Sequence, residues 1–241
     1  MTTLDTTPAG TVRLYLCGEP LEALPEGALW WPTGRVLVVS DLHLEKASSY
    51  ARQGQMLPPY DTSLTLSRLE GLCQRLRPDR VISLGDSFHD RGAEVRLSAA
   101  DTSRIQALTS ACDWVWVEGN HDPAPPASLG GRGAKVLRLG PLVLRHENEG
   151  ERGEICGHLH PVVRIRRRGR SVRRACFASD GERLVMPAFG ALTGGLNVCD
   201  PAFATIFSEP PMAFALGQGR VFALSPRHFE PDQPRLAHWR L

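Results

Sequence analysis

The stretch Val36-Leu-Val-Val-Ser-Asp-Leu-His43 decides the fold, because it joins a strand signal to a pair of polar side chains. Residues 36–40 form an apolar run that ends in serine, and such a run indicates a buried strand. Asp41 and His43 follow it directly. Residues two apart on an extended chain point the same way, so we expect both side chains to reach one metal ion.

Two further apolar runs end in polar motifs in the same way. Residues 81–84 are followed by Gly85-Asp86, and residues 114–117 by Glu118-Gly-Asn-His-Asp122. Apolar residues at helical spacing lie between the three runs and predict two helices. This alternation is typical of an α/β fold, in which functional residues gather at the carboxyl ends of the strands.

Local signals set the other predicted elements. Asp61 is expected to cap the first helix, which ends at Pro78. The segment 48–60 contains a glycine and two adjacent prolines and is predicted to be a loop. The second helix is predicted over residues 98–112. Further strands are predicted at residues 12–16, 28–31, 136–139, 142–145, 154–156, 162–168, 172–178, 183–186 and 220–224.

Composition narrows the class of protein. The chain has 241 residues, 42% of them hydrophobic and 22% charged, which suits one globular domain over residues 1–241 with two packed sheets. Six scattered cysteines without a CxxC pair indicate reduced thiols and exclude a zinc finger. No signal peptide or membrane-length apolar run is recognised, so we expect a cytoplasmic protein.

The histidines are distributed unevenly along the chain. Six of the eight lie in short polar motifs: His43, His89, His121, His146, His158 and His160. Most of these motifs alone are more often a turn, a polar strand end or a structural histidine, and Gly119-Asn-His-Asp122 is a stronger signal. Together they occur once each, in one order and after strand-like runs, and this combination favours a metal site.

These motifs resemble the signature of the calcineurin-like metallophosphoesterases. The resemblance implies a four-layer αββα sandwich with two packed mixed β-sheets, and a centre of two divalent metal ions. By motif, the implied ligands of the first ion are Asp41, His43 and His160, those of the second are Asn120, His146 and His158, and Asp86 bridges the two ions.

A closer resemblance, to the PdeM-type ligase-associated DNA-damage-response phosphoesterases, extends over nearly the whole chain. It is carried by Ser40-Asp-Leu-His-Leu-Glu-Lys46, Met56-Leu-Pro-Pro-Tyr-Asp61, Leu84-Gly-Asp-Ser-Phe-His-Asp90, Gly169-Arg-Ser-Val-Arg-Arg174, Val185-Met-Pro-Ala-Phe-Gly190 and Thr193-Gly-Gly195. This similarity implies a DNA-repair protein that acts with a DNA ligase, a helicase and an exonuclease.

His121 is the expected catalytic side chain, together with the bridging Asp86. Its neighbour Asn120 is an implied metal ligand, so the imidazole of His121 can point at the leaving-group oxygen and give it a proton. Many superfamily members carry a carboxylate or arginine at a fixed distance after Gly-Asp. Here His89 and Asp90 stand in that region, and either could orient the catalytic histidine.

The expected ligand set contains carboxylate, imidazole and amide groups but no thiolate. Two ions held by such groups neutralise a phosphodiester and lower the pKa of a bridging water, so that hydroxide is available at neutral pH. The ligand types suit Mn²⁺, Zn²⁺ or Fe²⁺. Among these three ions, the resemblance to the family favours Mn²⁺.

Arginines are concentrated around Gly169 in a predicted hairpin. Arg166, Arg167 and Arg168 are expected to contact the backbone of DNA or RNA, although a basic, solvated hairpin is the alternative. The expected function is therefore metal-dependent hydrolysis of phosphodiester bonds in nucleic acid by a metal-bridging hydroxide, as in a DNA-repair-associated endonuclease. Two alternatives remain open: an enzyme acting on a small metabolite or cyclic nucleotide, and a non-catalytic, metal-stabilised partner in a repair complex.

Overall fold

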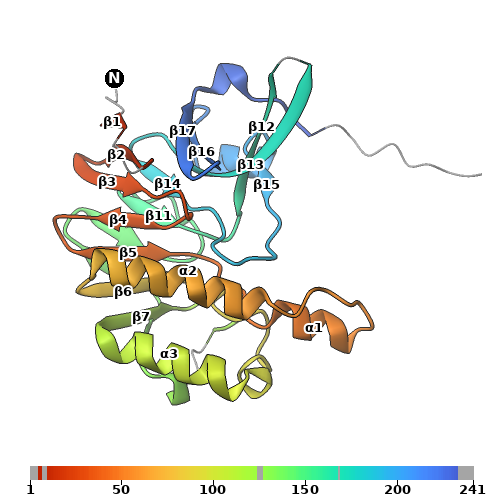
Figure 1. The fold of residues 1–241 in the computed structure, drawn as a ribbon. Coiled ribbons are helices and arrows are strands. Elements are labelled where there is room, and N and C mark those ends of the chain that lie inside the picture. Colours follow the sequence, from red (N-terminus) through yellow and green to blue (C-terminus); the bar gives the residue numbers. More distant parts are fainter. Residues whose placement is uncertain (1–4, 7–9, 124–126, 168, 233–241) are drawn as a thin grey trace, which may run out of the picture.

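An eight-stranded mixed sheet runs through the N-terminal half of the computed structural model, which describes residues 5–6, 10–123, 127–167 and 169–232 (Figure 1). Its strands pair in chain order. The first five are antiparallel, and β5 to β8 are parallel. The strands are β1 (Asp5–Thr6), β2 (Val12–Leu16), β3 (Glu19–Ala23), β4 (Leu29–Trp31), β5 (Val36–Val39), β6 (Arg80–Leu84), β7 (Asp113–Val117) and β8 (Arg132–Ala134).

Strand β5 is buried on both faces, as its continuous apolar sequence predicts. Leu37 and Val39 face helices α2 (Asp61–Leu76) and α3 (Ala99–Ala111), which cover one side of the sheet (Figure 1). Val36 and Val38 face the second sheet. Alternate side chains of a strand point to opposite faces, so a strand between two layers needs apolar residues at every position.

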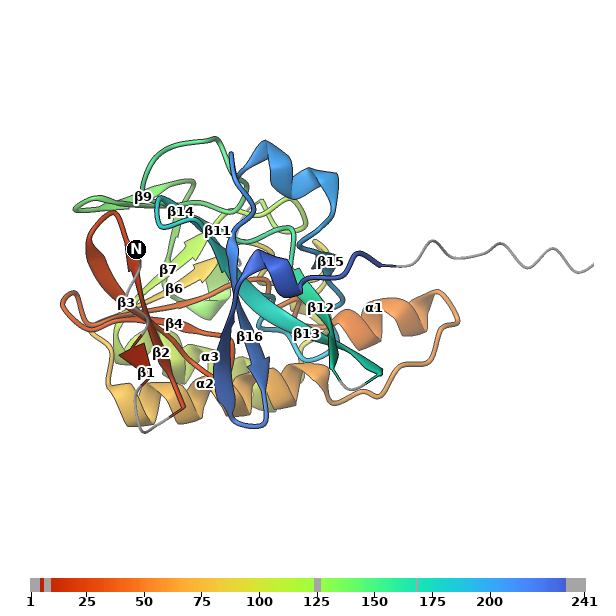
Figure 2. The same ribbon diagram turned by 90° about the horizontal axis from the view of Figure 1, so that it is seen from above.

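The second sheet is also mixed and packs face to face on the first. Its strands are β9 (Leu137–Leu139), β10 (Leu142–Leu144), β11 (Glu154–Cys156), β12 (Pro161–Arg167), β13 (Arg170–Ser179), β14 (Arg183–Val185), β15 (Leu196–Asn197), β16 (Met212–Gly217) and β17 (Arg220–Leu224). The β16–β17 hairpin lies beside β13 (Figure 2). Phe177 and Phe214 meet Leu14 and Ile82 in the core between the sheets.

The expected sandwich of two packed mixed sheets is confirmed, and its outer layers are unequal. Two α-helices cover the first sheet, whereas the second sheet packs against the short 3-10 helix Pro201–Thr205. Phe203 from this helix, with Ile206 and Phe207 after it, buries Cys156 and Cys176. Within the described ranges, no helix is long and apolar enough to cross a membrane.

Two local predictions were wrong. The segment predicted as a loop over residues 48–60 begins inside helix α1 (Lys46–Arg52). Asp61 does not cap helix α2, in which it is the first residue, because the N-cap of α2 is Tyr60. The buried carboxylate of Asp61 instead accepts a hydrogen bond of 3.0 Å from the backbone N–H of Ala47 in α1. The first-turn N–H groups of a helix have no partner within it, so Asp61 caps α1 through a tertiary contact.

The core between the sheets gives a test of the packing. Phe177 is fully buried there, and Phe177→Ala is expected to lower the free energy of unfolding by about 3–5 kcal/mol through lost burial and a cavity. Phe222→Ala, at a side chain that is 44% exposed, should cost less than about 1 kcal/mol. Urea denaturation measures both. Equal losses would place Phe177 outside the core.

Candidate metal centre

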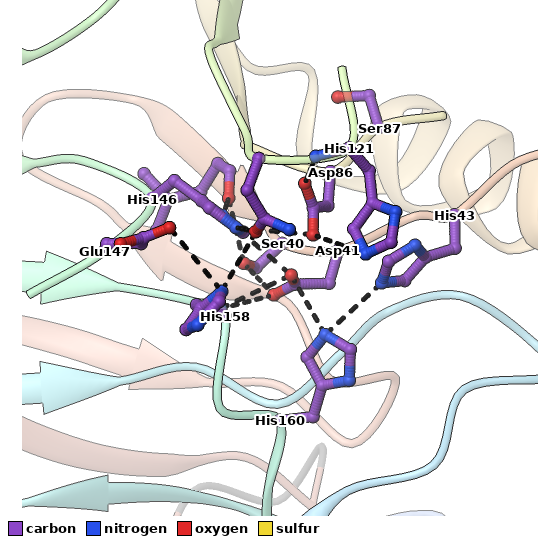
Figure 3. A network of polar contacts seen from close by, with 12 residues as sticks. Ser40, Asp41, His43, Asp86, Ser87, His121, His146, Glu147, His158 and His160 are labelled. Carbon is purple, nitrogen blue, oxygen red and sulfur yellow. Dashed lines mark hydrogen bonds and ion pairs between the residues drawn. The ribbon is translucent and has the colours of Figure 1, made fainter. Parts of the chain in front are cut away.

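The carboxyl ends of parallel strands from both sheets meet at one edge of the sandwich. Asp41, Asp86 and Asn120 follow β5, β6 and β7 of the first sheet. His146 and His158 follow β10 and β11, which are a parallel pair of the second sheet. This topology brings together side chains that are more than one hundred residues apart in the sequence (Figure 3).

The backbone of the ligand segments differs from the extended chain that the sequence predicts. Asp41, His43, Asp86, His158 and His160 all have positive φ angles, between 43° and 67°. This left-handed conformation costs a non-glycine residue about 1–2 kcal/mol. Tertiary hydrogen bonds hold it, because the N–H groups of Asp41 and His43 donate to the carbonyls of Gly85 and Asp86 at 3.2 and 2.9 Å. The side chains therefore converge through tight turns.

One group of ligand atoms consists of Asp41, His43 and His160. These atoms lie within 4.8 Å of one another. His160 Nε2 is 3.0 Å from Asp41 Oδ1 and 3.3 Å from His43 Nε2. Two imidazole nitrogens and a carboxylate oxygen thus face one point, as the ligands of a single cation do.

A second group lies beside the first and consists of Asp86, Asn120, His146 and His158. Asn120 Oδ1 is 3.0 Å from both His146 Nε2 and His158 Nδ1. His146 Nε2 is 3.3 Å from Asp86 Oδ2. The two groups adjoin, since His146 Nδ1 is 3.9 Å from Asp41 Oδ1. All seven predicted ligands are therefore gathered in two neighbouring groups, and Figure 3 labels all of them except Asn120.

Burial and charge shift the pKa values of these groups. Burial lowers the pKa of His43 to about 3, which leaves its imidazole neutral and able to donate a lone pair. Burial alone would raise the pKa of Asp86, but the hydrogen bond and charge of His146 lower it to about 2. Burial opposes the charged form of His146 as well, yet Asp86 and Asp41 raise its pKa to about 9. Asp86 and Asp41 thus favour a positive charge at the second group, in the place that a metal ion would take.

Three glycines of the motifs are required by close packing, a role that the sequence analysis missed. A Cβ atom on Gly85 would overlap the ring of His146. One on Gly119 would overlap Asp86, and one on Gly157 would overlap the carboxylate of Asp41. Each glycine precedes a ligand by one residue in the sequence, and this recurring position was the available signal.

Two further polar residues of the site were also missed. Ser40 is fully buried, and its Oγ lies 2.5 Å from Asp41 Oδ2 and 3.1 Å from the carbonyl oxygen of Leu84. Buried Asp122 accepts a hydrogen bond of 3.1 Å from the backbone N–H of Phe88. Both fix the loops that carry the predicted ligands Asp41 and Asp86.

His121 stands at the exposed rim of the second group, with 42% of its side chain accessible to solvent. Its backbone N–H donates to Asp86 Oδ1 at 2.9 Å, and its Nε2 lies 3.9 Å from Asp86 Oδ2. The ring of His89 stacks on that of His121, with centroids 5.6 Å apart and an interplanar angle of 16°. Asp90 instead forms a salt bridge of 2.7 Å with Arg96. Of these two residues, His89 is therefore the one that contacts His121.

Of the three arginines predicted to contact substrate, the structure describes the side chain of Arg166 alone. Exposed Arg166 forms a salt bridge of 3.0 Å with Glu230. The backbone of Arg167 ends strand β12, and Arg168 lies outside the described residues. Two other arginines of the hairpin, Arg173 and Arg174, line a pocket together with His160.

The geometry and donor set fit divalent metal ions. Each group combines buried carboxylate oxygen with imidazole nitrogen, and neither contains sulfur, which suits Mn²⁺, Fe²⁺ or Zn²⁺. Nδ1 of buried His43 has no hydrogen-bond partner among the described residues. The three residues whose ligand atoms converge in the first group are those predicted to hold the first ion: Asp41, His43 and His160.

Comparison with known proteins decides the family. The family model of the calcineurin-like phosphoesterases matches residues 34–171, more than half of the chain. The chain belongs to the calcineurin-like phosphoesterase family. Members of this family use two divalent metal ions, in agreement with the two groups of ligand atoms.

Solved structures include relatives of this chain. It is similar to the nuclease MPE of Pseudomonas putida, with 28% sequence identity and a TM-score of 0.69, over 89% of this chain and 100% of that protein. Yfce, a phosphoesterase from E. coli, matches with 15% identity and a TM-score of 0.39, over 78% of this chain and 96% of that protein. A search of curated proteins found no match.

Single substitutions in the two groups should remove one ion each. We expect His160→Ala and His158→Ala each to reduce the amount of bound Mn²⁺ from about two ions per chain to about one, because each substitution removes a ligand from a different group. His228→Ala, at an exposed histidine away from both groups, is the matched control. Elemental analysis after dialysis measures the stoichiometry. An unchanged ratio in both variants would remove these histidines from the ligand set.

Proposed function

We propose that this phosphoesterase hydrolyses phosphodiester bonds in nucleic acid, with Mn²⁺ as its preferred metal. The observation that carries the proposal is the pairing of the two adjoining ligand groups with an exposed imidazole, His121, at their rim. The 28% identity to a bacterial nuclease across nearly the whole chain supports nucleic acid as the substrate.

The ligands divide between two ions. Asp41, His43 and His160 would hold one, and Asn120, His146 and His158 the other. Asp86 would be shared. When bound, the two ions neutralise the phosphate and supply an activated water at neutral pH.

His121 would act on the leaving-group oxygen. Its backbone N–H is held by Asp86, so the half-exposed imidazole stays at the rim of the site. Stacking on His89 restricts rotation of the ring. An imidazole in this place can give a proton to the departing alkoxide, which leaves poorly without one. His89 is then a positioning residue for His121.

The cellular context is proposed from the sequence resemblance. The PdeM-type motifs, which include Met56-Leu-Pro-Pro-Tyr-Asp61 and Thr193-Gly-Gly195, support a role in DNA repair beside a DNA ligase, a helicase and an exonuclease. Such a role would be carried out in the cytoplasm, where bacterial DNA is repaired. We further propose that residues 1–241 form one domain.

Substrate class can be tested by a screen with Mn²⁺, Zn²⁺ and Fe²⁺. We expect hydrolysis of bis-p-nitrophenyl phosphate and of a single-stranded oligonucleotide, with slower release from the monoester p-nitrophenyl phosphate. Turnover of the oligonucleotide supports the proposal. Turnover restricted to cyclic nucleotides or small metabolites would show a small-molecule enzyme, and no turnover with any metal would show a non-catalytic protein.

The role of His121 gives a sharper test. His121→Ala is expected to lower kcat by about 10²–10⁴-fold while about two metal ions remain bound, because the imidazole moves a proton without being a ligand. His228→Ala should leave kcat unchanged. For a substrate whose leaving group is p-nitrophenolate, which needs no proton, His121→Ala should lower kcat much less. An equal loss on both substrates would contradict proton donation by His121.

A further inference from the structure

A lysine lies beside the metal centre in a chain whose basic residues are otherwise arginines. Only Lys46 and Lys135 are lysines among the 28 basic residues. Lys46 is the first residue of α1 and follows the predicted ligand His43 by three residues. It is partly buried, whereas Lys135 is exposed. Burial of an ammonium group is unfavourable, so the place of Lys46 calls for a role that a solvated surface charge does not have.

Tertiary hydrogen bonds fix the backbone on both sides of Lys46. The backbone N–H of Glu45 donates to Thr62 Oγ1 at 2.9 Å, and the buried Glu45 carboxylate accepts from the same hydroxyl at 3.0 Å. On the other side, the backbone N–H of Ala47 donates to Asp61 Oδ2 at 3.0 Å. Both partners belong to the first turn of α2. The charge of Lys46 is therefore carried by a backbone that is already in place before any ligand binds.

A row of rings leads from the rim of the metal centre to Lys46. The ring of His121 stacks on that of His89, and the ring of His89 contacts that of Tyr50, with centroids 5.6 Å apart in each pair. Nζ of Lys46 lies over the Tyr50 ring, 5.9 Å from its centroid. Burial, and after it the positive charge of Lys46, lower the pKa of His89. The ammonium thus lies close to His89, on the side of the centre where His121 stands.

The charge of Lys46 is not neutralised by a close partner. Lys46 forms no salt bridge and no side-chain hydrogen bond with another residue of the described ranges. Burial lowers its pKa, and the charge of Asp61 opposes this shift from a distance. The Asp61 carboxylate is itself buried and accepts from the backbone of Ala47. The three donors of the ammonium therefore remain available to a ligand.

The arginine nearest to the same row of rings is occupied. Arg96 also lowers the pKa of His89, but less than burial and Lys46 do. Its guanidinium donates to both carboxylate oxygens of Asp90, at 2.9 and 2.7 Å, and to Ser48 Oγ at 2.9 Å. Of these two cations beside His89, Lys46 is thus the one that can bind an anion from solution.

We propose that Lys46 binds the phosphate next to the scissile one, on the leaving-group side of the metal centre. This inference rests on the proposed function and adds a contact and a direction to it: the strand leaves the two ions past His121 and follows α1. The rings of His89 and Tyr50 lie between Lys46 and His121, so the ammonium meets the neighbouring phosphate and not the scissile one. An ammonium is a compact charge that binds phosphate in this way.

The salt dependence of binding tests this contact. A fluorescein-labelled oligothymidylate is titrated with Mn²⁺-loaded His121→Ala protein, whose turnover is slow, and anisotropy is recorded at several salt concentrations. Adding Lys46→Met should weaken binding roughly tenfold, the value of one charge-assisted hydrogen bond. It should also reduce the slope of log K against log salt by about 0.7, the value for one phosphate contact on a single strand. An unchanged slope would overturn the inference.

Two control variants separate charge from structure. Lys46→Arg keeps the positive charge and should keep the salt slope. Lys135→Met makes the same substitution at an exposed lysine and should change neither affinity nor slope. A slope lost equally in Lys46→Arg and Lys46→Met would show that the structure of α1 is disturbed, and would contradict a contact made by the charge.

Amine labelling tests the same contact without a substitution at Lys46. Reductive methylation of the Mn²⁺-loaded His121→Ala protein modifies both lysines, and mass spectrometry of the digested protein distinguishes them. Saturating oligothymidylate should slow modification of Lys46 and leave that of Lys135 unchanged. Equal rates at Lys46 with and without the oligonucleotide would overturn the inference.

Kinetics on two substrates distinguish the neighbouring phosphate from the scissile one. Lys46→Met should lower kcat/KM for the oligonucleotide roughly tenfold more than for bis-p-nitrophenyl phosphate, which has no second phosphate. Lys46→Arg should restore most of the activity on the oligonucleotide. An equal loss on both substrates would place Lys46 at the scissile phosphate or the metal ions and contradict the proposed contact.

Failure of this inference is distinguishable from failure of the proposed function. If the wild type cleaves the oligonucleotide while Lys46→Met keeps the salt slope and the substrate preference, nucleic-acid hydrolysis stands and the contact by Lys46 is wrong. If the wild type hydrolyses bis-p-nitrophenyl phosphate but neither binds nor cleaves the oligonucleotide, the proposed function fails, and the contact by Lys46 fails with it.

Discussion

Two carboxylates, Asp41 and Asp86, are buried where the edges of the two sheets meet, and the rest of the site depends on compensating their charge. Asp41 is fully buried and Asp86 is 2% exposed. An unpaired buried carboxylate costs several kcal/mol, so each needs hydrogen-bond donors and cations around it. Backbone N–H groups of His158 and His121 and the imidazole of His146 supply part of this compensation. Two divalent ions would supply the remainder.

This requirement explains the local backbone. The donors must approach the carboxylates from several directions, so the ligand segments form tight turns with positive φ at five ligand residues. Gly119 and Gly157 are needed because any side chain there would occupy the space of the carboxylates. The strain and the missing side chains lower stability locally, and the core between the sheets holds the turns in place.

The sequence predicted most of the first sheet because its signals are local. Residues 36–39 and 114–117 are apolar at every position, and Ser98 at the start of α3 caps that helix by accepting from Asp101. Strands β1, β3, β8, β15 and β16 were missed. The predicted ligands could be found because each follows a strand-like run.

What the sequence could not predict depends on contacts between distant segments. Asp61 has the sequence of a local cap, and only the folded chain brings Ala47 to it. The arginines near Gly169 look alike in the sequence, yet Glu230 pairs with Arg166 and Asp232 with Arg173. Pairing with a residue sixty positions away has no local signal.

The central claim is that the two groups of ligands hold two ions that share Asp86. Electron paramagnetic resonance of the Mn²⁺-loaded protein tests it most directly, because ions bridged by one carboxylate are magnetically coupled while separate ions are not. The account predicts the spectrum of an exchange-coupled Mn²⁺ pair in the wild type, which Asp86→Ala converts to that of uncoupled ions. Isolated Mn²⁺ in the fully loaded wild type would contradict it.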